Sequence, residues 1–102
     1  MNINKLKELA EGDNPQAQND LGVAYMTGAE VERDEKQAAY WFLRASSHGK
    51  SEAIANFGMC LLLGKGIEKD ISAALYALES AYLMGVENSI RNILDAIQKK
   101  RY

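Results

Sequence analysis

Apolar residues recur at intervals of three and four along most of the chain, in segments separated by glycine or by short polar residues. This spacing places the apolar side chains on one face of an α-helix. The first such segment covers residues 3–11 and ends at Gly12. Its apolar face consists of Ile3, Leu6, Leu9 and Ala10. Because glycines punctuate the pattern and Pro15 is the only proline, β-strands are not expected, and the chain is predicted to be all-α.

Short polar residues mark where the following helices begin, because their side chains can accept hydrogen bonds from the free amides of a first helical turn. The expected N-caps are Asn14, followed by Pro15 as the first helical residue, then Asp34, Ser51, Asp70, and Asn88 or Ser89. The expected helix ends are the glycines Gly28, Gly49, Gly64 and Gly85. The pattern predicts six helices, and their short connections predict that neighbouring helices are antiparallel.

The second half of the helical pattern repeats the first with a period of 36 residues, since residues 17–52 align with residues 53–88. Identical pairs are Ala17/Ala53, Gly22/Gly58, Gly28/Gly64, Glu32/Glu68, Asp34/Asp70, Ala38/Ala74, Tyr40/Tyr76, Ala45/Ala81 and Gly49/Gly85. A period in this range with two helices per unit is typical of a solenoid, in which each helix pair buries its apolar face against the next pair. The chain therefore contains about two and a half helix-turn-helix units.

The spaced residues of the first unit resemble the Sel1-like repeat, a relative of the tetratricopeptide repeat. That repeat has an Ala, then Leu-Gly-x-x-Tyr, Gly-x-Gly-Val, Asp-x-x-Lys-Ala-x-x-Trp and Ala-Ala-x-x-Gly. The matching residues are Ala17, Leu21, Gly22, Tyr25, Gly28, Val31, Asp34, Ala38, Trp41, Ala45, Gly49 and Ala53. The resemblance implies an α-α superhelix, in which Trp41 is a core residue.

The chain departs from the family pattern at several positions. In the first unit these are Glu30, where the second loop glycine is expected, Gln37 and Ser46. The second unit keeps Gly64, Gly66 and Ile67, but has Leu61 for the Tyr and Ala77 for the Trp. A third unit is only begun, with Ser89 and Leu94 in place of its first Ala and its Gly. We expect one domain over residues 1–102, with an N-terminal capping helix and linker (1–16), repeats at 17–52 and 53–88, and a C-terminal capping helix (89–102).

The loop segment Leu61–Asp70, with its sequence Gly-Lys-Gly, resembles a phosphate-binding loop at first sight. A nucleotide P-loop needs two glycines with four residues between them, then Lys and Ser or Thr, between a strand and a helix. This segment has neither that spacing nor a strand, and Glu30 at the matching place in the first loop would repel phosphate. Its glycines are expected to supply left-handed backbone that ends one helix and turns the chain toward Asp70.

Composition narrows the class of function. The 102 residues are 47% hydrophobic and 25% charged, with a net charge of −2, which is ordinary for a globular protein and does not favour nucleic-acid binding. The N-terminal residues lack a continuous apolar stretch, so we expect no signal peptide, no membrane span and a cytoplasmic location. The single cysteine excludes an internal disulfide and is consistent with a reducing compartment.

Candidate catalytic chemistry is sparse. Cys60 lies in an apolar run and is expected to be a buried thiol with a raised pKa, whereas His48 is expected to be a surface residue near a helix end. No cofactor, metal site or catalytic residue is predicted, and the chain is not expected to be an enzyme. The alternative is a hydrolase-like or penicillin-binding activity, which the resemblance suggests for cysteine-rich members. Those members carry paired cysteines in each repeat, whereas this chain has one.

One stripe of residues is more informative for binding. On the first helix of each unit, three positions spaced i, i+4 and i+7 share a face. They are Asn19, Val23 and Met26, then Ala55, Met59 and Leu62, then Arg91, Asp95 and Gln98. Stacked units would set these rows side by side as a shallow groove, apolar and methionine-rich in the middle. The expected protein-binding residues are Asn19, Val23, Met26, Met59, Leu62, Arg91 and Asp95. The alternative is that Met59 and Leu62 pack beneath a neighbouring helix.

These features predict a protein-protein interaction module of the adaptor or scaffold type, a role that the resemblance associates with bacterial signalling and stress. A narrower hypothesis is a bacterial immunity or inhibitor protein that neutralises a toxin with a basic face, since the chain is short and acidic. A third hypothesis is association of the chain with itself through the open ends of the solenoid. The sequence leaves monomer and weak homo-oligomer open.

Overall fold

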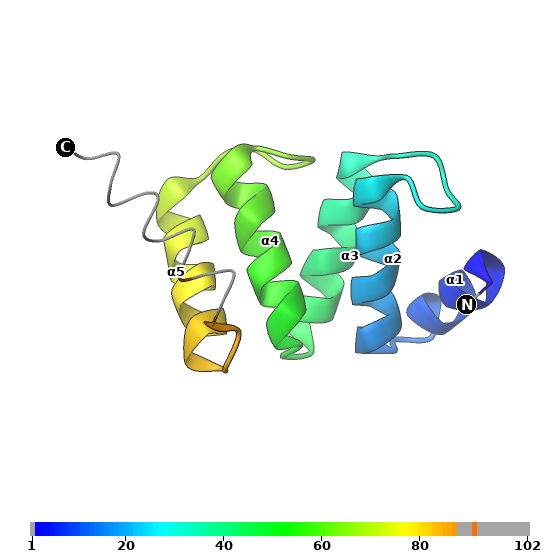
Figure 1. Ribbon diagram of the computed structural model, residues 1–102, viewed down its shortest axis with the longest axis horizontal. Helices are drawn as coiled ribbons and strands as arrows, with labels where there is room; N and C mark the ends of the chain where they lie inside the picture. The colour runs from blue at the N-terminus through cyan, green and yellow to red at the C-terminus, as the bar shows by residue number, and fades with distance from the viewer. Residues whose placement is uncertain (1, 88–90, 92–102) are drawn as a thin grey trace.

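The computed structural model describes residues 2–87 and residue 91, and within them every regular element is an α-helix. The helices are α1 (Ile3–Glu11), α2 (Pro15–Thr27), α3 (Glu35–Ser47), α4 (Ser51–Leu63) and α5 (Ile71–Leu83). They stand side by side in chain order, and α2 to α5 alternate in direction (Figure 1). The all-α prediction is confirmed. The expected sixth helix and the C-terminal capping segment at 89–102 lie outside the described residues, apart from Arg91.

The two units have the same helix bounds once the period of 36 residues is applied. Helix α2 corresponds to α4, and α3 corresponds to α5, residue for residue. Each helix makes its main contacts with the helices directly before and after it in the chain. This is the packing expected of a solenoid, in which a unit is stabilised by its neighbours.

Asparagine and aspartate side chains close the first turns of three helices. The Oδ1 atoms of these residues accept hydrogen bonds from backbone amides: Asn14 from Ala17, Asp34 from Lys36 and Gln37, and Asp70 from Ala73. These three predicted N-caps are confirmed. Helices α3 and α5 end at Ser47 and Leu83, two residues before the glycines expected to end them.

The prediction that Ser51 caps the fourth helix is wrong. The N-cap of α4 is Lys50, whose backbone is extended and whose side chain makes no capping hydrogen bond. Ser51 is the first residue inside the helix, and its Oγ lies 3.3 Å from a carboxylate oxygen of Glu52. Lys50 occupies the position that Asn14 has in the first unit, so the repeat geometry, rather than the nearest capping residue, decides where the helix begins.

The core forms three clusters that follow one another along the row of helices. The first cluster is Leu6, Ala10, Ala17, Leu21 and Trp41. The second is Ala38, Ala39, Phe42 and Cys60, and the third is Ala55, Leu78 and Ala81. Tyr25 packs against the first and second clusters and so links them. Trp41 is 7% exposed, which agrees with its expected place in the core.

A glycine in each first helix lets the second helix of the same unit approach closely. A Cβ added at Gly22 would lie 2.5 Å from Cδ1 of Phe42, and one at Gly58 would lie 3.1 Å from Cγ of Leu78. Both positions therefore favour the smallest side chain, because a tightly packed interior cannot accept an added methyl group without displacement.

Gly66 of the second loop touches the first turn of α3. A Cβ added at Gly66 would lie 1.9 Å from the carbonyl oxygen of Glu35, and the backbone of Gly66 is left-handed, with φ of 73°. The first unit has Glu30 at this position, also left-handed with φ of 62° and exposed. Helix α1 begins at Ile3, the counterpart of Ala39, so it has no first turn that corresponds to the one touching Gly66. Space for a side chain therefore exists at Glu30.

An ion pair joins the connection before α2 to α3. Arg44 of α3 donates a hydrogen bond to Oδ1 of Asp13, and its guanidinium carbon lies 5.1 Å from the ring centroid of Trp41 and 5.8 Å from that of Tyr40. The hydrogen bond and the positive charge of Arg44 lower the pKa of the Asp13 carboxyl. This cluster positions the N-terminal helix pair against the aromatic side chains of α3.

Candidate functional site

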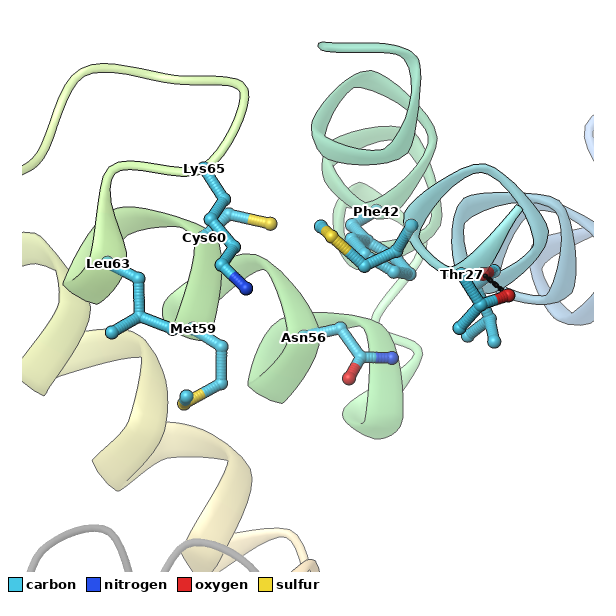
Figure 2. A pocket seen from close by; sticks show the side chains of 9 residues that line it. Thr27, Phe42, Asn56, Met59, Cys60, Leu63 and Lys65 are labelled. Carbon is cyan, nitrogen blue, oxygen red and sulfur yellow. Dashed lines mark hydrogen bonds between the residues drawn. The ribbon is translucent and has the colours of Figure 1, made fainter. Parts of the chain in front are cut away.

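An apolar pocket of about 280 Å³ opens between α2 and α4, and we call it the α2–α4 pocket. Its lining residues are Val23, Met26 and Thr27 of α2, Phe42 of α3, Asn56, Met59, Cys60 and Leu63 of α4, and Lys65 of the loop after α4. Figure 2 shows the labelled side chains on α4 and the loop after it, and on the neighbouring α2–α3 pair. The first helices of the two successive units therefore form its two walls.

The repeat geometry creates this pocket. Val23 and Met59 occupy the same position in their units, as do Thr27 and Leu63, so α2 and α4 present matching faces. Helix α3 packs between and behind the two first helices, and its Phe42, which is 3% exposed, closes the pocket on that side. The rim is open, since Val23 is 42% exposed and Leu63 is 52% exposed.

Three of the residues predicted for protein binding, Val23, Met26 and Met59, come together in this pocket. Asn19 lies deeper and is 7% exposed, and its Oδ1 accepts a hydrogen bond of 3.0 Å from Nδ2 of Asn56. This bond joins α2 to α4 beside the pocket. Asn56 is not among the residues predicted for binding, but it contacts one of them, Asn19.

The other predicted residues lie elsewhere. Leu62 packs against the third core cluster, between α4 and α5, and does not line the pocket. Arg91 is exposed, and its Nη2 donates a hydrogen bond of 3.2 Å to the hydroxyl of Tyr82. Asp95 and Gln98 lie outside the described residues. Met59 contacts both the pocket and the third cluster, so the groove and core interpretations both apply to it.

Several lining residues lie outside the stripe that helical spacing predicts. Asn56 and Leu63 lie one helical turn before and after Met59, so extending the row by i−3 and i+4 would have found them. The sequence predicts Cys60 only as a buried core residue, and Phe42 lies on a second helix, outside the predicted stripe on the first helices. Lys65 lies in a loop, where helical spacing gives no direction for the side chain, and no signal in the sequence assigned it to this surface.

The pocket has one charged side chain among its lining residues, Lys65. Lys65 is half-buried and has no ion-pair partner among the described residues. Burial first and the charge of Glu35 second raise the pKa of the Cys60 thiol, the charge of Lys65 lowers it, and the net value is about 11. The thiol is therefore protonated at neutral pH and behaves as part of the apolar wall, as the sequence predicted.

Other chemistry is limited in the part of the chain that the structure describes. No group of three or more His, Cys, Asp and Glu side chains there is arranged to hold a metal ion. His48 lies at the end of α3, where its Nε2 is 3.8 Å from Oδ1 of Asp13. Within the same residues, no helix combines the length and the apolar character needed to cross a bilayer.

Comparison with known proteins identifies the repeat. The family model described as the Sel1 repeat matches residues 15–50 and again residues 51–86. A Sel1 repeat protein from Oxalobacter formigenes has a similar crystal structure, with a TM-score of 0.84 and 33% sequence identity, over 91% of this chain and 70% of that one. The cysteine rich protein B of Helicobacter pylori is similar with a TM-score of 0.79 and 25% identity, over 91% of this chain and 72% of that one.

Two further similarities involve longer proteins. A protective antigen of uropathogenic Escherichia coli that displays an SLR fold matches with a TM-score of 0.79 and 34% identity, over 84% of this chain and 18% of that one. The curated DAP3-binding cell death enhancer 1 of Rattus norvegicus is 29% identical over 85 residues, which are 83% of this chain. The match covers 16% of that relative, so this chain spans about a sixth of its length.

Proposed function

The chain belongs to the Sel1 repeat family, whose members are generally protein-interaction modules, and we propose that it acts as a non-enzymatic module that holds a protein partner at the α2–α4 pocket. The observation that carries this proposal is the pocket itself. It is apolar, open at the rim and formed by matching faces of two stacked units. Exposed apolar side chains around a hollow of this kind mark interaction sites on protein surfaces.

The size of the pocket favours a partner side chain over a small-molecule ligand. Small-molecule sites commonly have about 300–1,000 Å³ and enclose most of the ligand. The α2–α4 pocket has about 280 Å³ and an open rim. Methionines are flexible and polarisable, so Met26 and Met59 can adjust to the shape of an inserted apolar side chain.

The residues at the pocket do not favour catalysis. Cys60 is 2% exposed and its pKa is about 11, so it is not a ready nucleophile. The single histidine, His48, lies beside Asp13 at the end of α3 and does not line the pocket. The similar protein from Helicobacter pylori is named as cysteine-rich, whereas this chain has one cysteine. We therefore favour a binding role over hydrolase-like or penicillin-binding activity.

A narrower form of the proposal is an immunity or inhibitor protein of the bacterial cytoplasm that binds a basic toxin, as a monomer or a weak homo-oligomer. It is supported by the net charge of −2 and by the acidic residues of the first loop, Glu30, Glu32 and Asp34, which are exposed. Such a partner would contact this loop in addition to the pocket, and its binding would weaken as salt is added.

The test compares partner capture by tagged variants at equal concentration. Met59→Glu places a carboxylate in the apolar pocket and should reduce capture of every specific partner at least tenfold. Tyr76→Glu on α5 is the matched control, because Tyr76 is 75% exposed and does not line the pocket. Circular dichroism establishes that both variants keep their helices. Equal capture by the wild type and Met59→Glu would refute the pocket as the binding surface.

A further inference from the structure

The α2–α4 pocket combines an apolar interior with one positive charge at its edge. Figure 2 shows the side chain of Lys65 running from the loop after α4 over the face that carries Cys60 and Met59. The charge of Lys65 acts on the Cys60 thiol, so the ammonium group stands close to the interior of the pocket. No carboxylate lines the pocket.

Several basic residues have counter-ions, whereas Lys65 has none among the described residues; the same is true of Lys36 and Lys69, but these two are exposed and Lys65 is half-buried. Arg33 lies 2.8 Å from Glu35, Lys50 lies 3.5 Å from Glu52, and Arg44 contacts Asp13. Lys65 has no carboxylate within 4.0 Å among the described residues. The charge of Glu35 acts on the Cys60 thiol, and the carboxylate of Glu35 is ion-paired with Arg33.

Half-burial makes the missing counter-ion at Lys65 significant. An ammonium group near apolar side chains is less well hydrated than one in bulk water, so a carboxylate brought to it forms a stronger hydrogen bond than at an exposed lysine. The pocket is therefore complementary to an apolar group that carries a negative charge beside it.

An amide on the same α4 wall adds a second polar contact. Nδ2 of Asn56 donates to Asn19, which fixes the orientation of the Asn56 side chain. Its Oδ1 accepts no hydrogen bond from the described residues and remains available to a backbone N–H of a bound chain. A polypeptide would satisfy this acceptor, the apolar interior and Lys65 together.

We propose that the occupant of the α2–α4 pocket is a segment of a partner protein in which an apolar side chain fills the pocket and a neighbouring Asp or Glu side chain binds Lys65. This inference rests on the proposed function, because it specifies the chemistry of the segment bound there. It also separates this site from the first loop, whose acidic residues would attract a basic surface.

Peptide selection on the full-length chain tests the proposal. A library of nine-residue peptides with a fixed central leucine and random neighbours, displayed through their C-termini so that no free C-terminal carboxylate is present, is selected against the wild type. The selected sequences should be enriched in Asp and Glu close to the leucine. Selection against Lys65→Glu should reverse this preference toward Lys and Arg. A synthetic acidic peptide should bind Lys65→Gln about tenfold more weakly than the wild type, the scale of one charge-assisted hydrogen bond.

Two control variants make the outcomes distinguishable. Lys69→Glu changes the same charge on an exposed residue of the same loop that does not line the pocket, and it should leave the acidic preference unchanged. Met59→Glu should abolish selection altogether. If Met59→Glu abolishes binding but the wild type and Lys65→Glu select the same residues beside the leucine, the acidic segment is refuted while the proposed function stands. If Met59→Glu binds the peptides as the wild type does, both the pocket as the binding site and the acidic segment as its occupant are refuted. Binding that requires a free C-terminal carboxylate would also overturn the side-chain assignment.

Discussion

Replacing Gly66 by alanine tests how the second loop holds the two units together. The added Cβ would lie 1.9 Å from the carbonyl oxygen of Glu35, 2.4 Å from its carbonyl carbon and 2.9 Å from the amide nitrogen of Lys36. All three are backbone atoms of the first turn of α3, so no side chain can rotate away to make room. The loop or the helix would have to move.

The expected cost has two parts that a matched control separates. A non-glycine residue in the left-handed region costs about 1 kcal/mol, and overpacking a tight contact costs about 1–3 kcal/mol more. Gly49 has φ of 78° and no atom within 4 Å of an added Cβ, so Gly49→Ala carries only the first part. Gly66→Ala should therefore reduce the free energy of unfolding by about 3 kcal/mol, roughly 2 kcal/mol more than Gly49→Ala.

Urea unfolding provides the measurement, with Trp41, the only tryptophan, as a fluorescent reporter and circular dichroism as an independent probe. With a slope of about 2 kcal/mol per molar urea, the extra 2 kcal/mol would lower the midpoint of Gly66→Ala by about 1 M relative to Gly49→Ala. Glu30→Gly should raise the midpoint slightly, because it relieves the left-handed backbone without losing a contact. Equal midpoints for Gly66→Ala and Gly49→Ala would show that the contact with α3 contributes no strain, and the reasoning would be wrong.

Three other outcomes follow from single side chains. Asp13→Asn should lower the melting temperature at neutral pH but not in strong acid. Arg44 lowers the pKa of the Asp13 carboxyl, so the stability that this ion pair contributes is complete above the ordinary pKa of 3.8 and is lost as the pH falls. A difference in melting temperature between the two proteins that persists at pH 2 would contradict this. Cys60→Ala should be less stable than the wild type at pH 7, and the difference between their urea midpoints should narrow between pH 9 and 11. The reason is that the thiol of the unfolded chain has a pKa near 9.0, whereas the buried thiol has a pKa of about 11, so the wild type loses stability over this range. A difference that stays constant with pH would contradict this. Gln18 is fully buried; its Oε1 has no hydrogen-bond partner, and its Nε2 donates to the carbonyl oxygen of Ala10, which also accepts from the amide of Asp13. Gln18→Leu removes the unpaired oxygen together with that hydrogen bond, so it should change the free energy of unfolding by less than about 1 kcal/mol, whereas Gln18→Glu buries a charge and should lower it strongly. Similar urea midpoints for the two variants would contradict this expectation.

The fold was largely predictable because its signals are local and occur twice. Asn14, Asp34 and Asp70 close first turns as expected, and the period of 36 residues sets identical helix bounds in both units. The exception at Lys50 has a physical reason. A capping residue can be recognised in the sequence, but the extended position before a helix is imposed by the preceding turn, whichever residue stands there.

The candidate site was predictable only in part. Helical spacing correctly indicates that Val23 and Met26 share a face, and the repeat relates that face to Met59. Spacing does not show which part of the face a neighbouring helix covers, and α5 covers Leu62. The contribution of Lys65 depends on the path of a loop backbone, which no periodic pattern describes.

Glu30 has a consequence for building longer arrays from this chain. An array made by copying residues 51–86 would place Gly66 at every internal junction and could be extended indefinitely. Copies of residues 15–50 would set a left-handed glutamate against the helix start of each preceding unit, where Gly66 has no room for even a methyl group. The two units are thus alike in shape but not interchangeable in order, and the number of units can be increased by copying only one of them.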